Sequence, residues 1–333
     1  MKKRFVFPIL LVIQIVLVQV LACFPDTVER YYSTNFYQSL SLFSRVLIGW
    51  IPFSVGDVIY LCLLVAGFGW IYVKKQRFLK NWKENSFEII RFITLLYFLF
   101  HVLWGLNYYR NPLNEKLDLK KEYSLKQLKE FTQRIVLKTN SLQFKLMHNT
   151  SQAVIFPYTE KELMCMASDG YSRLTLHLPG FNYVQPNIKA SLFSYPLSYM
   201  GFGGYLNPFT NEAQINTLKP KFSTPQTICH EMAHQLGYAS ESECNFLGFL
   251  AAWHHEDLYF KYSASTFVLH YCLYHLELMQ KGSSECFRKQ LNQGVLLNFN
   301  ENKLFWQQHE TCSTQTCRLS FCISQTVCNL RKR

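Results

Sequence analysis

The segment His230-Glu231-Met232-Ala233-His234 has the residue types and the spacing of a catalytic zinc site. Side chains four residues apart on a helix project from one face, so both imidazoles can bind one Zn²⁺ ion. Glu231 stands beside them and can act as general base toward a zinc-activated water. The chain has only ten His, so chance rarely produces this pattern. We therefore predict His230 and His234 as metal ligands and Glu231 as the catalytic residue.

A catalytic zinc site needs a third protein ligand. The metzincin pattern would place a His at position 240, but Ser240 stands there, which disfavours that class. Glu241 and Asn245 instead resemble the E-x-x-A-[DN] element of Glu-ligated zincins, in which the Glu binds the metal and the polar residue supports a ligand His. We predict Glu241 as third ligand and Asn245 as its support, with Glu243 as the alternative ligand. Ser240 and Glu243 also have capping-box spacing, which would give Glu243 a structural role.

Substrate contacts are expected from two other places. The Gly-rich stretch 203–216 can supply an edge strand that pairs with an extended peptide, which makes Gly204, Phe209 and Glu212 candidate substrate-binding residues. A packed region of turns and strands is the alternative interpretation. Tyr262 is a candidate donor to the oxyanion, and packing in the core is the alternative for this side chain.

The chain resembles a bacterial family known as domain-of-unknown-function family 3810. The similar segments are Trp104–Arg110, Asn207–Ala213, His230–Gly237 with Glu241–Phe246, and Tyr262–Ser263. The resemblance extends from the first apolar segment to about Trp306. It implies a protein with three membrane helices and an outer zincin-like domain. Because the substrate of this family is unknown, the resemblance adds no chemistry to that of the motif.

The elements around the motif follow from local sequence signals. Thr224 can cap a helix, Pro225 suits its first position, and Gly237 suits the left-handed residue just past its end. Ser124 can begin an amphipathic surface helix, because the apolar residues after it have helical spacing. Residues 191–217 are rich in Tyr, Phe, Gly and Ser, which indicates short strands and turns without helix. We predict a mainly α, α+β zincin-like domain.

Three apolar segments precede this domain, at residues 5–24, 52–73 and 87–106. A run of about 20 residues spans a hydrocarbon core of about 30 Å, so each is predicted to be a transmembrane helix. Lys and Arg cluster at the N-terminus and between the second and third segments. The positive-inside rule places both clusters in the cytoplasm. Three crossings then place the C-terminal domain on the outer side of the cytoplasmic membrane.

Composition agrees with a membrane protein, since 49% of the chain is hydrophobic and 17% is charged. The net charge of +12 comes from basic clusters beside the apolar segments. No base-stacking module accompanies them, so we predict no nucleic-acid partner. The predicted division is a membrane domain at 1–110, a zincin-like domain at 111–310, and a tail at 311–333. The Cys spacing of this tail fits neither zinc ribbons nor zinc fingers, and we interpret the tail as out of frame or degraded.

The predicted function is a zinc metallopeptidase, anchored in the lipid bilayer, that hydrolyses a peptide or protein substrate outside the cytoplasm. One alternative is a catalytically inactive protein of the same fold that binds a partner or senses an envelope component. Another is a transporter in which the motif is coincidental. The transporter hypothesis requires polar residues in all three apolar segments, and only His101 lies deep in one.

Overall fold

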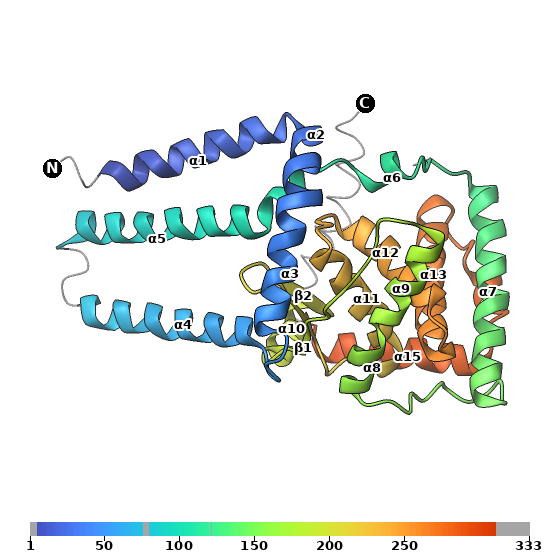
Figure 1. Ribbon diagram of the computed structural model, residues 1–333. Helices are drawn as coiled ribbons and strands as arrows, with labels where there is room; N and C mark the ends of the chain where they lie inside the picture. The colour runs from blue at the N-terminus through green and yellow to red at the C-terminus, as the bar shows by residue number, and fades with distance from the viewer. Residues whose placement is uncertain (1–4, 76–79, 121, 311–333) are drawn as a thin grey trace.

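Three long helices extend in roughly the same direction from one end of the protein, and the other elements gather at the opposite end (Figure 1). The computed structural model describes residues 5–75, 80–120 and 122–310. The long helices are α1 (Val6–Ala22), α4 (Val55–Lys74) and α5 (Trp82–Leu103). Helices α4 and α5 are long and apolar enough to cross a membrane. Helix α1 counts as a third span if it is joined to Pro25–Ile48 across a 96° bend.

The predicted bounds of the first two segments agree with helices α1 and α4 to within three residues. The bounds of the third segment differ more. Helix α5 begins at Trp82 and ends at Leu103, so it starts five residues before the predicted 87 and stops three residues before 106. A 3-10 helix, η4 (Gly105–Tyr109), follows it directly. The tail at 311–333, where an atypical Cys-containing segment was predicted, lies outside the described residues.

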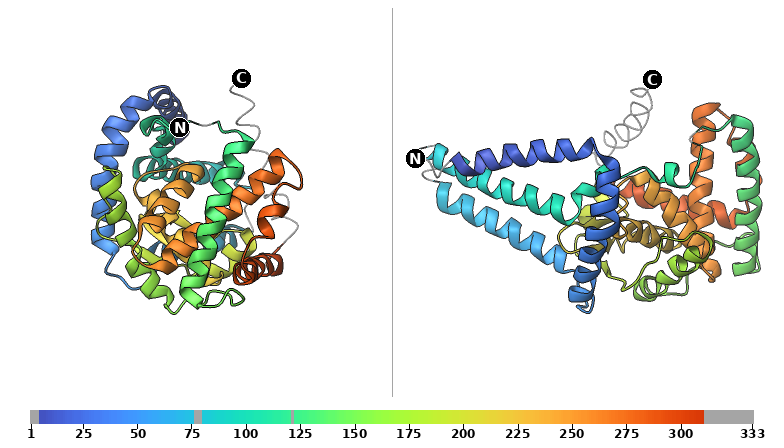
Figure 2. Two further views of the ribbon diagram at one scale, coloured as in Figure 1. Left: turned by 90° about the vertical axis from the view of Figure 1, so that its right-hand side faces the viewer. Right: turned by 45° about the horizontal axis from the view of Figure 1, so that its top comes forward.

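The connection between α1 and α4 is helical and runs across the ends of the long helices (Figures 1 and 2). It consists of α2 (Pro25–Thr27), the π-helix η2 (Val28–Phe36) and α3 (Tyr37–Ile48). Polar side chains of α3 contact the end of the motif helix across nearly 200 residues of sequence. Residues 25–48 therefore belong structurally with the described residues that follow α5. These two stretches together are called the outer part of the protein.

The outer part is mainly helical, as predicted. Its longest helices are α7 (Leu125–Met147), α11 (Thr224–Gln235), α12 (Glu241–His254), α13 (Leu258–Met279) and α15 (Gln293–Gln308). The shorter ones are α6 (Leu113–Lys116), α8 (Glu160–Met166), α9 (Ser168–His177), α10 (Ser194–Met200), η5 (Lys221–Ser223) and α14 (Glu285–Arg288). Ser124 caps α7 in a capping box with Gln127, which confirms the predicted start of that helix.

A small mixed sheet lies beside α11. Its strands are β1 (Ile188–Ala190), β2 (Gly204–Asn207) and β3 (Glu212–Ile215), in the order β1-β3-β2. Strand β3 pairs in parallel with β1 and antiparallel with β2, so β2 is an edge strand. The prediction of strands and turns over 191–217 is right for β2 and β3. It is wrong for α10, a seven-residue helix with Pro196 in its first turn that ends at Gly201, where φ is +80°.

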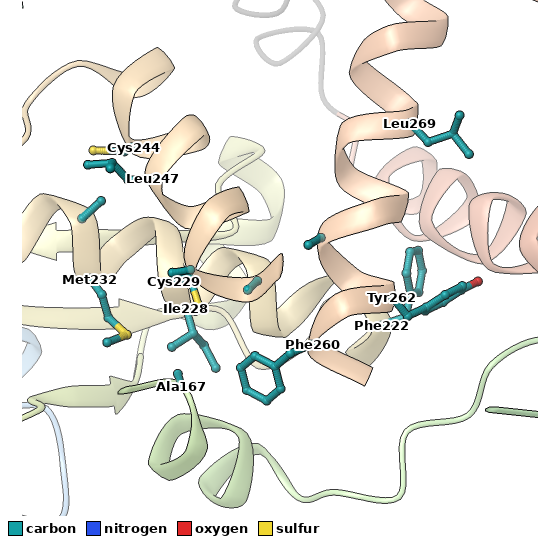
Figure 3. Packing of buried hydrophobic residues seen from close by; sticks show 14 of the residues in the cluster. Ala167, Phe222, Ile228, Cys229, Met232, Cys244, Leu247, Phe260, Tyr262 and Leu269 are labelled. Atoms are coloured by element: carbon teal, nitrogen blue, oxygen red, sulfur yellow. The ribbon is translucent and has the colours of Figure 1, made fainter. Parts of the chain in front are cut away.

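The hydrophobic core surrounds α11, whose residues are nearly all buried. Ile228, Cys229 and Met232 of this helix pack in one cluster with Leu247 of α12 and Phe260 of α13 (Figure 3). This apolar side of α11 faces the core. The side that carries the two His residues faces a pocket, so core packing fixes the direction of the polar face.

Candidate metal centre

Helix α11 begins and ends where its sequence signals indicate, within one residue. Its first residue is Thr224, preceded by Ser223 at the N-cap, and Pro225 lies in its first turn. Gly237 has a φ of +86°, the left-handed conformation expected just past the helix end. The ends of the helix are thus set locally, and the two His residues occupy its last two turns.

Helix α12 brings Glu241 to both imidazoles. His230 Nε2 lies 3.2 Å from one carboxylate oxygen of Glu241, and His234 Nε2 lies 3.6 Å from the other. The close crossing of the two helices depends on Gly248, because a Cβ at that position would lie 2.7 Å from the backbone nitrogen of His230. No sequence signal singled out Gly248, although a glycine inside a helix often marks a close approach of backbones.

Glu243, the alternative third ligand, points to a different partner. Its carboxylate accepts a hydrogen bond of 2.6 Å from the backbone nitrogen of Leu113. The expected capping box with Ser240 is absent, since Ser240 caps α12 without a side-chain hydrogen bond and pairs with the hydroxyl of Ser242. The structure therefore brings Glu241, and not Glu243, to the pair of His residues.

The second nitrogen of His234 is held by a backbone carbonyl. Nδ1 of His234 donates to the carbonyl oxygen of Tyr238 at 2.7 Å, and the Cys244 sulfur lies 3.2 Å away. Because Nδ1 is occupied by this bond, Nε2 is the ring nitrogen that is left to bind a metal ion. Asn245, predicted for this support, donates instead to the Tyr271 hydroxyl at 3.0 Å. One residue along a helix turns a side chain by about 100°, so Cys244 faces His234 and Asn245 does not.

Glu231 is buried beside the two imidazoles. A carboxylate oxygen of Glu231 and one nitrogen of each ring all lie within 4.8 Å of one another. Its Oε2 atom has no hydrogen-bond partner among the residues that the structure describes. Burial raises the pKa of Glu231, and the nearby His230 and His234 act in the opposite direction. A buried carboxylate with an unbonded oxygen and a raised pKa is suited to accept a proton.

The donor set fits a divalent metal ion. Burial alone would raise the pKa of Glu241, but hydrogen bonds from the two imidazoles lower it below the usual value. The two ring nitrogens and the carboxylate oxygens of Glu241 thus lie against one another, as the ligands of one cation would. Two imidazole nitrogens with one carboxylate oxygen are a zinc donor set that leaves a coordination position open.

The site opens into a pocket of about 740 Å³ between α11, β2 and the end of α5. Strand β2 contributes Gly204, at which an added Cβ would lie 2.9 Å from the Glu231 side chain. The end of α5 and the 3-10 helix after it contribute Trp104 and Tyr108. Trp104 also donates from its indole nitrogen to the carbonyl oxygen of His234 at 3.2 Å. Neither aromatic residue was predicted to have a role, although both lie in the segment Trp104–Arg110 that carries the family resemblance.

Three predicted contact residues lie away from this pocket. Glu212 is fully buried and accepts hydrogen bonds from the first backbone nitrogens of α4, so its carboxylate stabilises a helix start. Phe209 packs edge-on against Tyr60 of α4. Tyr262 lies in the core with its hydroxyl directed away from α11, where it donates to Asn298 (Figure 3). Of the predicted substrate-binding and oxyanion residues, Gly204 alone lines the pocket.

The fold and the site define a mainly helical protein with two or three candidate membrane-spanning helices and a His-Glu-His cluster in its outer part. Residues 32–321 match the model of a family described as protein of unknown function (DUF3810), and the chain belongs to this family. The match covers most of the chain and confirms the resemblance; it begins after the first apolar segment and extends past Trp306. No curated protein matches the chain. No solved structure matches it either.

Proposed function

We propose that the protein is a zinc-dependent peptidase of the gluzincin type, anchored in a membrane. The observation that carries the proposal is the meeting of Glu241 with His230 and His234 from the adjacent helix. A surface His pair on an ordinary helix would have no reason to be buried against a carboxylate from another element. The free edge of strand β2, beside the motif helix, is a place where an extended peptide could pair.

His230, His234 and Glu241 would hold the ion. Bound zinc would supply Lewis acidity toward the scissile carbonyl and lower the pKa of water. Glu231 takes a proton from the attacking water and delivers it to the leaving amine as the C–N bond breaks. The water oxygen ends on the carbonyl carbon, so the products are a carboxylate and an amine. The Tyr238 carbonyl keeps His234 in the required tautomer throughout.

The outer side of the cytoplasmic membrane is the proposed location. Lys74, Lys75, Lys80 and Lys83 lie at the far ends of α4 and α5, opposite to the metal centre. Positive residues are retained in the cytoplasm, so this loop would be inside and the metal centre outside. In this orientation the substrate is a polypeptide of the cell envelope.

Zinc binding and turnover test the proposal separately. The variant Glu231→Gln should keep stoichiometric zinc but lose cleavage of a mixed peptide pool by at least about 100-fold, because the proton acceptor is gone. His234→Ala should lose the zinc itself. His254→Ala, in the same helix as Glu241 but stacked on His177, is the matched control and should retain both. Purified wild-type protein without zinc would contradict the proposal. Zinc retained with no peptide cleavage would favour the inactive, partner-binding alternative.

A further inference from the structure

The pocket of the candidate metal centre begins at the end of a membrane-spanning candidate. Helix α5 ends at Leu103, and Phe100, Trp104 and Tyr108 line the pocket. The start of α4 is equally close to the sheet. Asp57, in the first turn of α4, accepts a hydrogen bond from the Tyr205 hydroxyl of strand β2. The start of α4 and the end of α5 therefore lie beside strand β2 and helix α11, which form the pocket.

The opposite rim of the pocket is apolar and exposed. Met200 and Phe202, which connect α10 to β2, line the pocket and are 57% and 50% exposed. Tyr199 precedes them and is also exposed. Helix α10 and β2 lie at the end of the outer part from which the long helices extend (Figure 1). Large apolar side chains exposed at this level are suited to the boundary between lipid and water.

Helix α3 lies at the same end of the outer part, next to the long helices (Figure 1). The chain bends by 96° after α1, so α3 runs across the long helices and not along them. One face of α3 is buried and bonds to α11 through Tyr37 and Ser41. The opposite face exposes large apolar side chains, at Phe43, Val46, Leu47 and, just past the helix, Trp50. This division is typical of a helix that lies in the membrane interface. The metal centre is then about one helix diameter from the lipid, roughly 10 Å.

The pocket is open away from the membrane as well. A second cavity of about 1080 Å³ lies between α7, α12 and α13, and it shares Glu241, Asn245 and Tyr271 with the first. Phe131 and Phe249 are among the aromatic residues that line it. An extended chain can therefore enter from the membrane side, pass the metal centre along edge strand β2, and leave into the second cavity.

We propose that the substrate is a membrane-anchored polypeptide, cleaved in the segment that directly follows its membrane-spanning helix. The proposal rests on the proposed peptidase function and names its substrate class. A metal centre that opens at the lipid boundary reaches the first residues outside the membrane. Soluble peptides and segments far from the membrane should be cleaved more slowly, because they are not held at the lipid boundary beside the rim of Met200 and Phe202.

Lipid contact at the rim can be tested without any substrate. Full-length protein carrying the photoreactive amino acid p-benzoylphenylalanine at position Phe202 is reconstituted in vesicles of phosphatidylethanolamine and phosphatidylglycerol. Irradiation should give lipid adducts. The matched control is position Ile155, which is 73% exposed and lies between α7 and α8, far from the long helices. Adducts at least fivefold more abundant at 202 are expected, and equal yields at both positions would overturn the proposed placement of the pocket.

Cleavage tests the substrate class itself. Single-span model polypeptides carry one randomised segment, either directly after the span or about 30 residues further out, a reach of about 100 Å when extended. Both forms are tethered to the same vesicles, so their local concentrations match. The wild-type protein with zinc should cleave the near segment at least about tenfold faster than the far one, and the Glu231→Gln variant should cleave neither.

The outcomes separate the two proposals. Equal cleavage of near and far segments, dependent on Glu231, would overturn the substrate class and leave the peptidase proposal standing. Absence of any cleavage that depends on Glu231, of these forms or of a soluble peptide pool, would overturn both. The variant Phe202→Ser should lose the preference for the near segment while retaining zinc, because the apolar rim is interrupted.

Discussion

At the scale of single residues, the candidate chemistry depends on how tightly Glu231 is confined. The imidazoles lie on one side of its carboxylate and strand β2 lies on the other. Burial raises the pKa of Glu231, while His230, His234 and, to a smaller extent, the buried Lys219 lower it. Burial in turn lowers the pKa of Lys219 to about 8. Gly204 leaves the space that the carboxylate occupies. The position of the proposed base thus depends on the absence of a side chain at Gly204.

Gly204→Ala should therefore damage the proposed activity. The added Cβ would lie 2.9 Å from the Glu231 side chain and 2.7 Å from the carbonyl oxygen of Gln214. A displacement of about 1 Å in a catalytic group can cost about 100-fold in rate, so we expect a loss of that order with zinc still bound. Peptide cleavage and zinc content would be measured together. Gly203→Ala, whose Cβ meets no atom closer than 3.4 Å, should lose much less. Equal losses would show that the position of Glu231 is not the cause.

At the scale of elements, the helices after α1 act as a support for α11. Tyr37 donates to the carbonyl oxygen of Gln235, and Gln38 donates to that of Leu236. Arg110, which follows α5 and η4, donates to the carbonyl oxygen of Gly237 and forms two hydrogen bonds with Glu29 of η2. These donors satisfy carbonyl groups at the end of α11 that have no partner within the helix.

The Glu29–Arg110 ion pair should make stability depend on pH. Burial alone would raise the pKa of Glu29, but Arg110 and Lys116 lower it below its ordinary value of 4.5. Because the pKa is lower in the folded state, the stabilisation is complete at neutral pH. It is lost as the pH falls from about 4.5 through the folded pKa. Glu29→Gln should cost about 3 kcal/mol at pH 7, since it leaves a buried guanidinium without its carboxylate.

Denaturant unfolding of the purified protein at pH 7 and at pH 3 would check this prediction. The difference between wild type and Glu29→Gln should shrink at the lower pH, because Glu29 is then largely protonated in the unfolded state and part of the stabilisation by the ion pair is lost. Glu285→Gln is the control, since its ion pair with Lys289 is exposed and should contribute less than about 1 kcal/mol. A Glu29→Gln penalty that stays constant with pH would contradict the assigned role.

At the scale of the whole molecule, the spans and the outer part form one structural unit. Trp104, next to the end of α5, and Tyr37 of α3 pack in one apolar cluster with Ala239, which lies between α11 and α12. Glu212 of β3 accepts hydrogen bonds from the start of α4. The pocket of the candidate metal centre is therefore lined by residues from both sides of the predicted division at residue 110, although the candidate ligands all follow it.

A fragment that begins at residue 111 should consequently be defective. It lacks Tyr37, Ser41, Trp104 and Arg110, whose donors satisfy buried carbonyl groups near the metal centre. Each of these hydrogen bonds contributes about 0.5–1.5 kcal/mol, and the apolar packing of Tyr37 and Trp104 is lost with them, so the fragment should lack a large part of the stability of a domain. Zinc content and thermal unfolding of the fragment and of the full chain in detergent would be compared. A fragment that binds zinc and melts like the full chain would contradict this view.

Local signals in the sequence determined the motif helix and the apolar segments. Thr224, Pro225 and Gly237 specify the bounds of α11, because caps and left-handed residues act within one turn. Periodicity and length likewise predicted α7 and the long helices. Signals of this kind need no knowledge of distant residues.

Only the tertiary structure decided which residues meet around that helix. Glu241 and Glu243 are equally acidic and two positions apart, and the crossing of α11 with α12 at Gly248 selects between them. Cys244 replaces Asn245 beside His234 for the same reason of helix geometry. The position of the site beside α5 and α3 depends on contacts across 100 to 200 residues, such as those of Tyr37 and Trp104 with α11. Such contacts arise from packing of whole elements, which no local pattern records.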